Sequence, residues 1–167
     1  MTELLLNQVD TLGDQWFSGK LQGCATDRIE KGVYMYGITR EIDFCYGHRL
    51  LNYDGKCRHL HGHNGRAIIT IAADTLDDRG MVFDFSDVKK AVATWIDKNL
   101  DHRMLLCKDD PVVPILEELG EPMFLMDTNP TAENIAKLIY EVTANHGFPI
   151  VEASLWETPK CYATFRG

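Results

Sequence analysis

The stretch VYMYGITREIDFCYGH, residues 33–48, decides the fold class. Alternate positions in it are apolar or aromatic and share one parity: Tyr34, Tyr36, Ile38, Ile42, Phe44 and Tyr46. Side chains of a β-strand leave its two faces in turn, so this alternation predicts a half-buried strand. His48 is in phase with the apolar set, which places an imidazole at the end of the same face.

A polar turn at residues 51–56 follows this strand, and further elements come after the turn. NGRAIITIAAD (64–74) predicts a second strand whose odd face carries His61, His63, Ala67, Ile69 and Ile71. MVFDF (81–85) predicts a third strand, residues 104–122 a loop with a short helix, and MFLMD (123–127) a short strand. IVEASLWETPKCYATF (150–165) predicts two strands joined by a turn near Pro159.

Two segments have apolar residues at helical spacing. The first, with Ser86 as the expected N-cap, carries Val88, Ala91, Val92, Trp95, Ile96 and Leu100. The second begins near TNPTAEN (128–134) and carries Ile135, Ala136, Ile139 and Val142. Together these elements predict an α+β domain over residues 32–167, with an antiparallel sheet and two helices on one face. Residues 1–31 are interpreted as an N-terminal extension.

Composition narrows the functional classes. The protein has 167 residues, enough for one domain, and 17 basic against 25 acidic residues give a net charge of −8. This charge argues against a nucleic-acid or anionic-membrane surface. The apolar run Leu4–Leu6 is too short for a signal peptide or a membrane span, and five cysteines without framework spacing are typical of reduced thiols. We therefore expect a cytoplasmic protein.

The stretch GKCRHLHGHN (55–64) is the main candidate for chemistry. His61 and His63 are two apart on an expected strand, so their imidazoles share a face, and His48 is the natural third member. Imidazole nitrogen is a preferred zinc ligand, and catalytic zinc keeps three protein ligands. The pair alone is also compatible with a surface coincidence, but His48 and the nearby Cys57 favour a metal site. His59 lies nearer the turn and is the least expected ligand.

Cys57 has two possible roles at such a site. It could be a fourth ligand that closes a structural zinc site, or a catalytic thiolate beside an open zinc, stabilised by the cation and by Lys56 and Arg58. Ligand types alone leave both alternatives open.

Two further positions carry acidic groups that could act in a site. Asp101 directly precedes His102 after the first helix, and a carboxylate can orient an imidazole for proton transfer, although such a dipeptide is also an ordinary helix stop. Glu157 shares parity with apolar residues of its strand, so it needs a donor. That donor is either a protein cation or a ligand such as the amide–amidine edge of a pterin or guanine.

Six signatures occur in one order across residues 34–166: FCYGHRL, CRHLHGHN, MVFDFSDVK, LDHRML, NPTAENIA and LWET. In this combination the protein resembles the 6-pyruvoyltetrahydropterin synthase and 6-carboxytetrahydropterin synthase family. The resemblance implies zinc on His48, His61 and His63, Cys57 as the catalytic thiol, Asp101 with His102 as a second proton-transfer group, and Glu157 as the pterin anchor, helped by Thr131. It also implies the tunnelling fold, whose sheets join between subunits into a barrel. The expected assembly is a hexamer of two trimers with active sites at subunit interfaces.

The spacing around Cys57 points to one branch of this family. Three residues separate Cys57 from HGH, as in the bacterial carboxy enzymes of queuosine and 7-deazapurine pathways, and no glutamate stands between Gly55 and His61. The resemblance thus implies a zinc-dependent 6-carboxy-5,6,7,8-tetrahydropterin synthase that converts 7,8-dihydroneopterin triphosphate with release of triphosphate and acetaldehyde. The alternatives are a 6-pyruvoyltetrahydropterin synthase and a non-catalytic zinc or pterin-binding protein. Lys56, Arg58 and Arg66 are the candidate cations for the triphosphate.

The sequence departs from the family pattern at two places near the histidines. Small residues usually precede the first histidine, whereas Tyr46 and Gly47 stand there in this protein. An aromatic residue commonly follows HGHN, whereas Gly65 follows it here. We expect both departures to reshape the pocket without removing any chemistry.

Overall fold

The computed structural model describes residues 34–167, so the predicted N-terminal extension over residues 1–31 lies outside the described part. Six strands form one sheet in the order β4-β3-β1-β2-β5-β6. Their bounds are Tyr36–His48 (β1), His61–Ala73 (β2), Arg103–Cys107 (β3), Met123–Met126 (β4), Ile150–Thr158 (β5) and Cys161–Phe165 (β6). The sheet is built on the long β1–β2 hairpin, whose antiparallel pairing runs from Tyr36 opposite Ala73 to His48 opposite His61.

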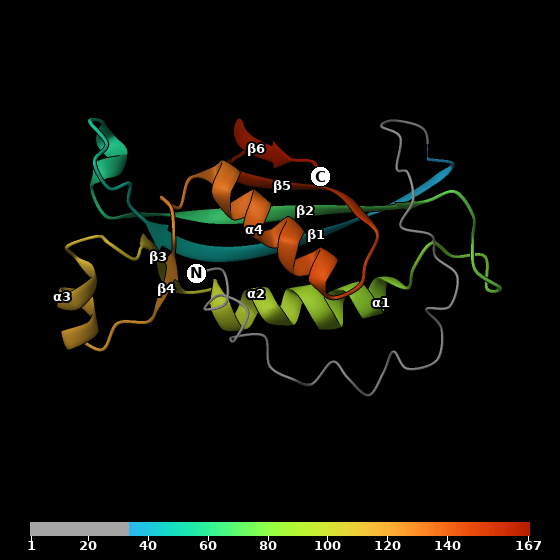
Figure 1. The fold of residues 1–167 in the computed structure, drawn as a ribbon, viewed down its shortest axis with the longest axis horizontal. Coiled ribbons are helices and arrows are strands. Elements are labelled where there is room, and N and C mark those ends of the chain that lie inside the picture. The colour runs from blue at the N-terminus through green and yellow to red at the C-terminus, as the bar shows by residue number, and fades with distance from the viewer. Residues whose placement is uncertain (1–33) are drawn as a thin grey trace. The chain divides into compact units, whose positions relative to one another are not determined.

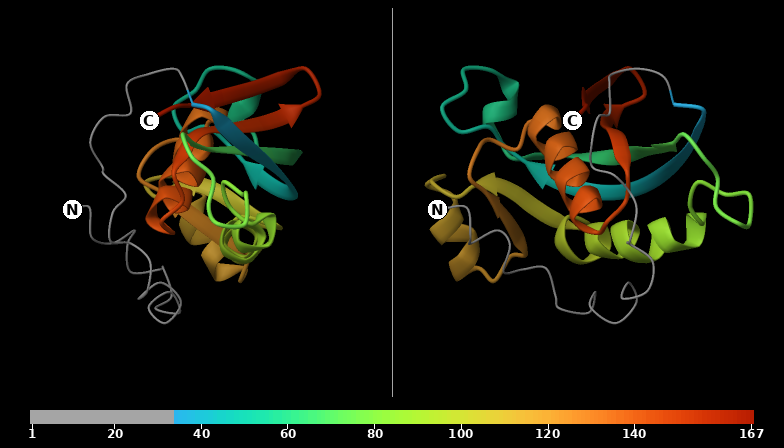
Figure 2. Two further views of the ribbon diagram at one scale, coloured as in Figure 1. Left: turned by 90° about the vertical axis from the view of Figure 1, so that its right-hand side faces the viewer. Right: turned by 45° about the vertical axis from the view of Figure 1, so that its right-hand side comes forward.

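Two helical segments cover one face of this sheet. Phe85–Val88 (α1) and Thr94–Asn99 (α2) are joined by a π-helical stretch, Lys89–Ala93, while α3 spans Val113–Glu118 and α4 spans Ala132–Asn145. Figures 1 and 2 show α4 and the α1–α2 segment on the same side of the sheet. No helix among residues 34–167 has the length and apolar character to cross a membrane.

The core lies between these helices and the odd face of β2. Its fully buried members come from both layers: Val88, Val92, Ile96, Leu100, Ile135, Ala136 and Ile139 from the helical layer, and Ala67, Ile69, Ala153 and Leu155 from the sheet. The same parity and helical spacing predicted these residues from the sequence. The α+β class with helices on one face is confirmed.

The sheet is mixed rather than wholly antiparallel. Strands β2, β5 and β6 continue the antiparallel pairing, but β1 pairs with β3 and β3 with β4 in parallel. Strand β3 lies in the segment expected to be a loop. Its Leu105 and Leu106 are both fully buried. A short strand that is buried on both faces has no alternation, which is why the period-two criterion missed it.

The expected strand over residues 81–85 is wrong. Residues 81–84 are irregular, and α1 begins at Phe85 with Asp84, not Ser86, as its N-cap. The Asp84 carboxylate accepts a hydrogen bond from the Ser86 backbone N–H at 2.7 Å. Val82 and Phe83 pack against the core without pairing to a neighbouring strand, and such a pattern of apolar residues resembles a strand in sequence.

Replacing a core residue of α4 tests this packing. Ile139 is fully buried, so Ile139→Ala should lower the free energy of unfolding by about 2–5 kcal/mol. Ile115 on α3 is 56% exposed, and Ile115→Ala is the matched control with little expected effect. Denaturant unfolding measures both, and equal losses for the two variants would contradict the described core.

Candidate metal centre and active site

The β1–β2 hairpin brings three histidines together. His48 and His61 are directly opposite each other in the register, and His63 follows two residues later on the same face. One ring nitrogen from each lies within 4.8 Å of the others, and the Nε2 atoms of His48 and His61 are 3.0 Å apart. Tetrahedral ligands on a zinc ion are about 3.4 Å from one another. The described geometry therefore fits a metal ion held by His48, His61 and His63.

Backbone carbonyls orient two of these rings. His48 Nδ1 lies 2.8 Å from the Pro130 carbonyl, and His61 Nδ1 lies 2.8 Å from the His59 carbonyl. A carbonyl only accepts, so each Nδ1 carries a proton, and Nε2 is the atom of each ring that is directed to the centre. His59, the least expected ligand, thus contributes its backbone rather than its side chain.

The environment of His48 favours the neutral form that binds metals. The residue is 3% exposed. Burial lowers the pKa of His48 below its ordinary value, and this outweighs the opposing effect of the hydrogen bond to Pro130. His48 therefore stays neutral at neutral pH, with its proton on Nδ1, as a metal-binding imidazole must.

The NPT segment at the start of α4 holds the Pro130 carbonyl in place. The Asn129 side chain makes two hydrogen bonds with the backbone of Leu51, one to its N–H at 2.7 Å and one to its carbonyl at 2.9 Å. This pair of bonds ties the loop after β1 to the beginning of α4. Residues 129–131, which lie outside the β1–β2 hairpin, therefore position the ring of His48 through the Pro130 carbonyl.

Thr131 is the N-cap of α4. Its hydroxyl accepts a hydrogen bond from the Asn134 backbone N–H at 3.3 Å, and Pro130 lies just before the cap rather than at the first helical position. Capping alone accounts for the hydroxyl at this position. A role for Thr131 in pterin binding stays a prediction.

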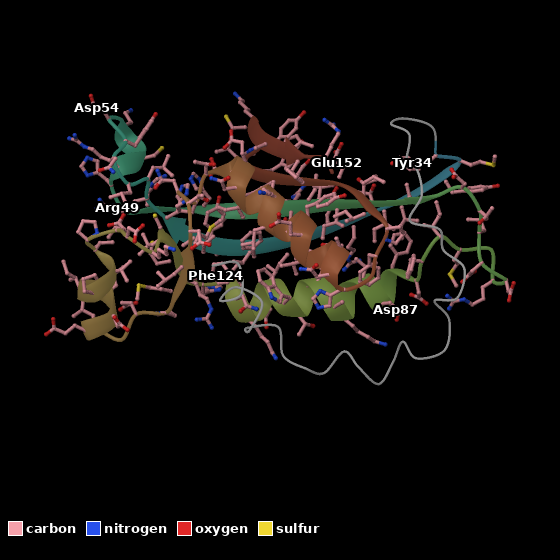
Figure 3. The ribbon with its side chains drawn as sticks, in the orientation of Figure 1. Tyr34, Arg49, Asp54, Asp87, Phe124 and Glu152 are labelled. Carbon is pink, nitrogen blue, oxygen red and sulfur yellow. The ribbon has the colours of Figure 1, made fainter. Side chains whose placement is uncertain are left out.

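The loop after β1 has a second anchor next to the metal centre. Arg49 Nε lies 3.0 Å from Asp110 Oδ2, and the Asp110 side chain is fully buried. Figure 3 places Arg49 and Asp54 at the same end of the molecule, where this loop projects beyond the sheet. Since Arg49 directly follows His48, the ion pair restrains the backbone of a candidate ligand.

Glu157 faces the histidines from β5. Its Oε1 lies 3.8 Å from His48 Nε2 and 4.0 Å from His63 Nε2, and it accepts a hydrogen bond from the Tyr46 hydroxyl at 3.0 Å. Burial, together with Glu157, raises the pKa of Tyr46, so the phenol stays a neutral donor. Among residues 34–167 the second oxygen, Oε2, has no hydrogen-bond partner. A half-buried carboxylate needs a hydrogen-bond donor, and the Tyr46 hydroxyl is that donor for Oε1. Oε2 is left available for a ligand.

Cys57 lies in the loop that joins the two histidine strands. It is half-buried within a single 3-10 turn, Lys56–Arg58, and its carbonyl accepts a hydrogen bond from the Leu50 N–H at 2.9 Å. Among the described residues the group of converging ligand atoms contains the three histidines and not Cys57. This arrangement favours the open three-histidine site over a closed site with a fourth ligand.

Asp101 and His102 form a pair attached to the backbone of β1. His102 Nδ1 lies 2.7 Å from Asp101 Oδ2, and the other carboxylate oxygen accepts from the Cys45 N–H at 2.8 Å. Partial burial alone would raise the pKa of Asp101, but the hydrogen bonds from Cys45 and His102 lower it below the ordinary value. The pair is thus an oriented imidazole on a carboxylate rather than a loose helix end. The His102 side chain remains 78% exposed.

The expected cations differ in their availability. Arg66 is held by two carboxylates, with its Nε 2.9 Å from Asp43 and its Nη1 3.4 Å from Glu41. Lys56 and Arg58 lie with exposed side chains in the turn that carries Cys57, and Arg58 Nη1 is 3.8 Å from Asp54 Oδ1. Among residues 34–167 Lys56 has no carboxylate partner, so it is better placed for an anionic ligand than Arg66.

Comparison with known proteins agrees with this geometry. Residues 37–167 match the family model described as 6-pyruvoyl tetrahydropterin synthase. The 6-carboxy-5,6,7,8-tetrahydropterin synthase of Rickettsia typhi is 38% identical over 135 residues, covering 77% of this chain and 98% of that protein. The enzyme of the same name from Haemophilus influenzae is 30% identical over 140 residues, covering 79% and 99%.

Solved structures show the same fold. An uncharacterized protein from Wolinella succinogenes superposes with a TM-score of 0.68 at 29% identity, covering 79% of this chain and 98% of that one. The 6-pyruvoyl tetrahydropterin synthase of Caenorhabditis elegans gives a TM-score of 0.59 at 24% identity, covering 81% and 99%. The expected tunnelling fold is confirmed, and the protein belongs to the 6-pyruvoyl tetrahydropterin synthase family of enzymes.

Proposed function

We propose that this protein is a zinc-dependent 6-carboxy-5,6,7,8-tetrahydropterin synthase acting on 7,8-dihydroneopterin triphosphate. The observation that carries the proposal is the convergence of three histidine ring nitrogens beside a half-buried carboxylate with one unpaired oxygen. The relative from Rickettsia typhi bears this name, and its length is almost fully covered. The product would serve 7-deazapurine or queuosine synthesis in the cytoplasm.

The donor set supports zinc as the metal. Three imidazoles, with no fourth protein ligand among residues 34–167, are typical of catalytic zinc sites. Bound zinc supplies Lewis acidity to the hydroxyls of the substrate. The carbonyls of Pro130 and His59 hold the ligand rings ready for this role.

Glu157 is the proposed anchor of the pterin ring. The amide–amidine edge of a pterin presents two adjacent N–H donors, and a carboxylate accepts such a pair with both oxygens. Oε2 is unpaired within residues 34–167, and Oε1 retains acceptor capacity beside the Tyr46 hydroxyl. Thr131, which directly follows the residue whose carbonyl orients His48, is proposed as a supporting contact.

Cys57 and the Asp101–His102 pair are the proposed proton-transfer groups. The Cys57 thiolate removes a proton from the three-carbon substituent of the pterin, and His102, oriented by Asp101, exchanges the other. The C–O bond to the triphosphate breaks. One water molecule then adds as a carbon–carbon bond of the substituent is cleaved, which leaves a carboxylate on the ring and releases acetaldehyde. Lys56 and Arg58 offer positive charge to the triphosphate.

We further propose that the active site is completed between subunits of a hexamer, a dimer of trimers. Among residues 34–167 no hydrogen bond or ion pair joins His102 to Cys57 or to the three histidines. Strands β4 and β6 are the edges of the sheet, and unpaired edges can add strands from neighbouring copies. Joining of such edges would close the barrel and let the Asp101–His102 pair of one subunit serve the metal centre of another.

The main alternative is a 6-pyruvoyltetrahydropterin synthase with the same residues. Incubation with 7,8-dihydroneopterin triphosphate, followed by mass spectrometry, separates the two products. We expect 6-carboxy-5,6,7,8-tetrahydropterin and acetaldehyde. Formation of 6-pyruvoyltetrahydropterin would refute the proposed reaction and support the alternative. Absence of turnover by the metal-loaded protein would favour a non-catalytic zinc or pterin-binding protein.

The metal assignment predicts unequal effects of two neighbouring histidines. Purified protein should contain about one zinc per subunit, and His61→Ala should lose most of it. His59→Ala is the matched control, because its backbone carbonyl still orients His61. Metal analysis by atomic absorption measures both variants, and zinc retained in full by His61→Ala would refute the three-histidine site.

Replacing Cys57 distinguishes a catalytic thiol from a structural zinc ligand. Because the histidines converge without it, Cys57→Ala should keep its zinc and its melting temperature. Turnover should fall roughly a hundredfold to ten-thousandfold, the usual size of a lost proton-transfer group. A variant that is metal-free and unstable would show that Cys57 is a structural ligand instead.

Subunit mixing tests the shared site. Cys57→Ala and His102→Ala should each be inactive alone. Co-assembled at equal amounts, they should regain about a quarter of the wild-type activity, since random pairing gives that share of sites both intact groups. Complete inactivity of the mixed hexamers would place both groups in one subunit.

A further inference from the structure

Tyr46 contacts both the candidate metal ligands and the candidate pterin anchor. It is 3% exposed, and its hydroxyl donates to Glu157 Oε1 at 3.0 Å. Its ring meets His48 edge-on, with centroids 5.4 Å apart and planes at 77°, and lies 5.8 Å from the ring of His63. Neither the metal chemistry nor the proton transfer proposed above uses this residue.

Gly65 makes the room that the Tyr46 ring occupies. A Cβ atom at position 65 would lie 2.8 Å from Tyr46 Cε1, which is too close for a buried ring. The ring cannot easily withdraw, because it also stacks on Phe44 at a centroid distance of 5.3 Å. Tyr46 and Gly65 are both positions at which the sequence departs from the family pattern near the histidines. The contact couples the two positions, because the ring of Tyr46 on β1 occupies the space that a side chain at position 65 on β2 would need.

We propose that Tyr46 is a positioning residue for Glu157, an inference that rests on the proposed role of Glu157 as the pterin anchor. Oε1 lies only 3.8 and 4.0 Å from the Nε2 atoms of His48 and His63, so a cation at the histidines attracts the carboxylate. The Tyr46 hydrogen bond restrains Oε1 and leaves Oε2 available to the ligand. The ring supplies the packing that keeps the phenol at this place.

Titration with neopterin, followed by fluorescence on zinc-loaded protein, tests the hydroxyl. Tyr46→Phe should raise the Kd about tenfold, the usual effect of losing a hydrogen bond to a charged group, without changing zinc content. In a Glu157→Gln background the same substitution should raise the Kd only about twofold, because the bond to a neutral amide is weaker. Tyr162→Phe is the control; Tyr162 is 57% exposed and its hydroxyl makes no hydrogen bond within residues 34–167.

Moving the aromatic ring from position 46 to position 65 distinguishes the effect of the Tyr46 hydroxyl on Glu157 from the effect of the ring on packing. Gly65→Phe and Tyr46→Ala should each lower the Tm by about 10 °C, through overpacking and through a cavity. The double variant should recover most of the Tm but not the neopterin affinity, since it has a ring and no phenol.

Two results would overturn the inference. One is an unchanged Kd for Tyr46→Phe, and the other is an equal loss in the wild-type and Glu157→Gln backgrounds, either of which shows that Tyr46 does not act through Glu157. Failure of the wild-type protein to bind neopterin would instead refute the proposed function, and the inference with it.

Discussion

The register of the β1–β2 hairpin places His48 opposite His61, and the candidate site depends on this pairing. A shift by one residue would turn every side chain of one strand to the other face and separate the two imidazoles. The same register buries Ala67, Ile69 and Ile71 against the helices. Hydrophobic burial therefore stabilises the register that brings the three histidines of the candidate metal centre together.

Groups outside the hairpin then refine that geometry through the backbone. The Pro130 carbonyl orients His48, and the Asn129 side chain ties the segment containing Pro130 to the loop after β1. The buried Arg49–Asp110 pair restrains the same loop. Breaking a buried pair by removing one partner leaves an uncompensated charge. The candidate metal centre is thus supported from α4 and from the β3–α3 connection as well as from its own strands.

The residues around Glu157 show how one carboxylate can be kept available for a ligand close to a metal centre. Its Oε1 lies 3.8 Å from His48 Nε2 and 4.0 Å from His63 Nε2, and the Tyr46 phenol donates a hydrogen bond to the same oxygen. Gly65 permits the hydrogen bond between Tyr46 and Glu157, because the absence of a side chain at position 65 leaves space for the Tyr46 ring. The side chain at position 65 therefore affects the support of Glu157 without contacting Glu157 itself.

Alternation and helical spacing in the sequence alone determined the α+β class, the shared face of His48, His61 and His63, and the core faces of α2 and α4. These features follow from periodicity within one element. Tertiary structure decided what depends on distant segments: the parallel strand β3, which has no alternation because both its faces are buried, and the Tyr46–Glu157 hydrogen bond between residues of β1 and β5. It also decided the ring orientations of His48 and His61, because the carbonyls of Pro130 and His59 accept hydrogen bonds from their Nδ1–H groups. Every residue has a backbone carbonyl, so residue identity does not predict such a contact.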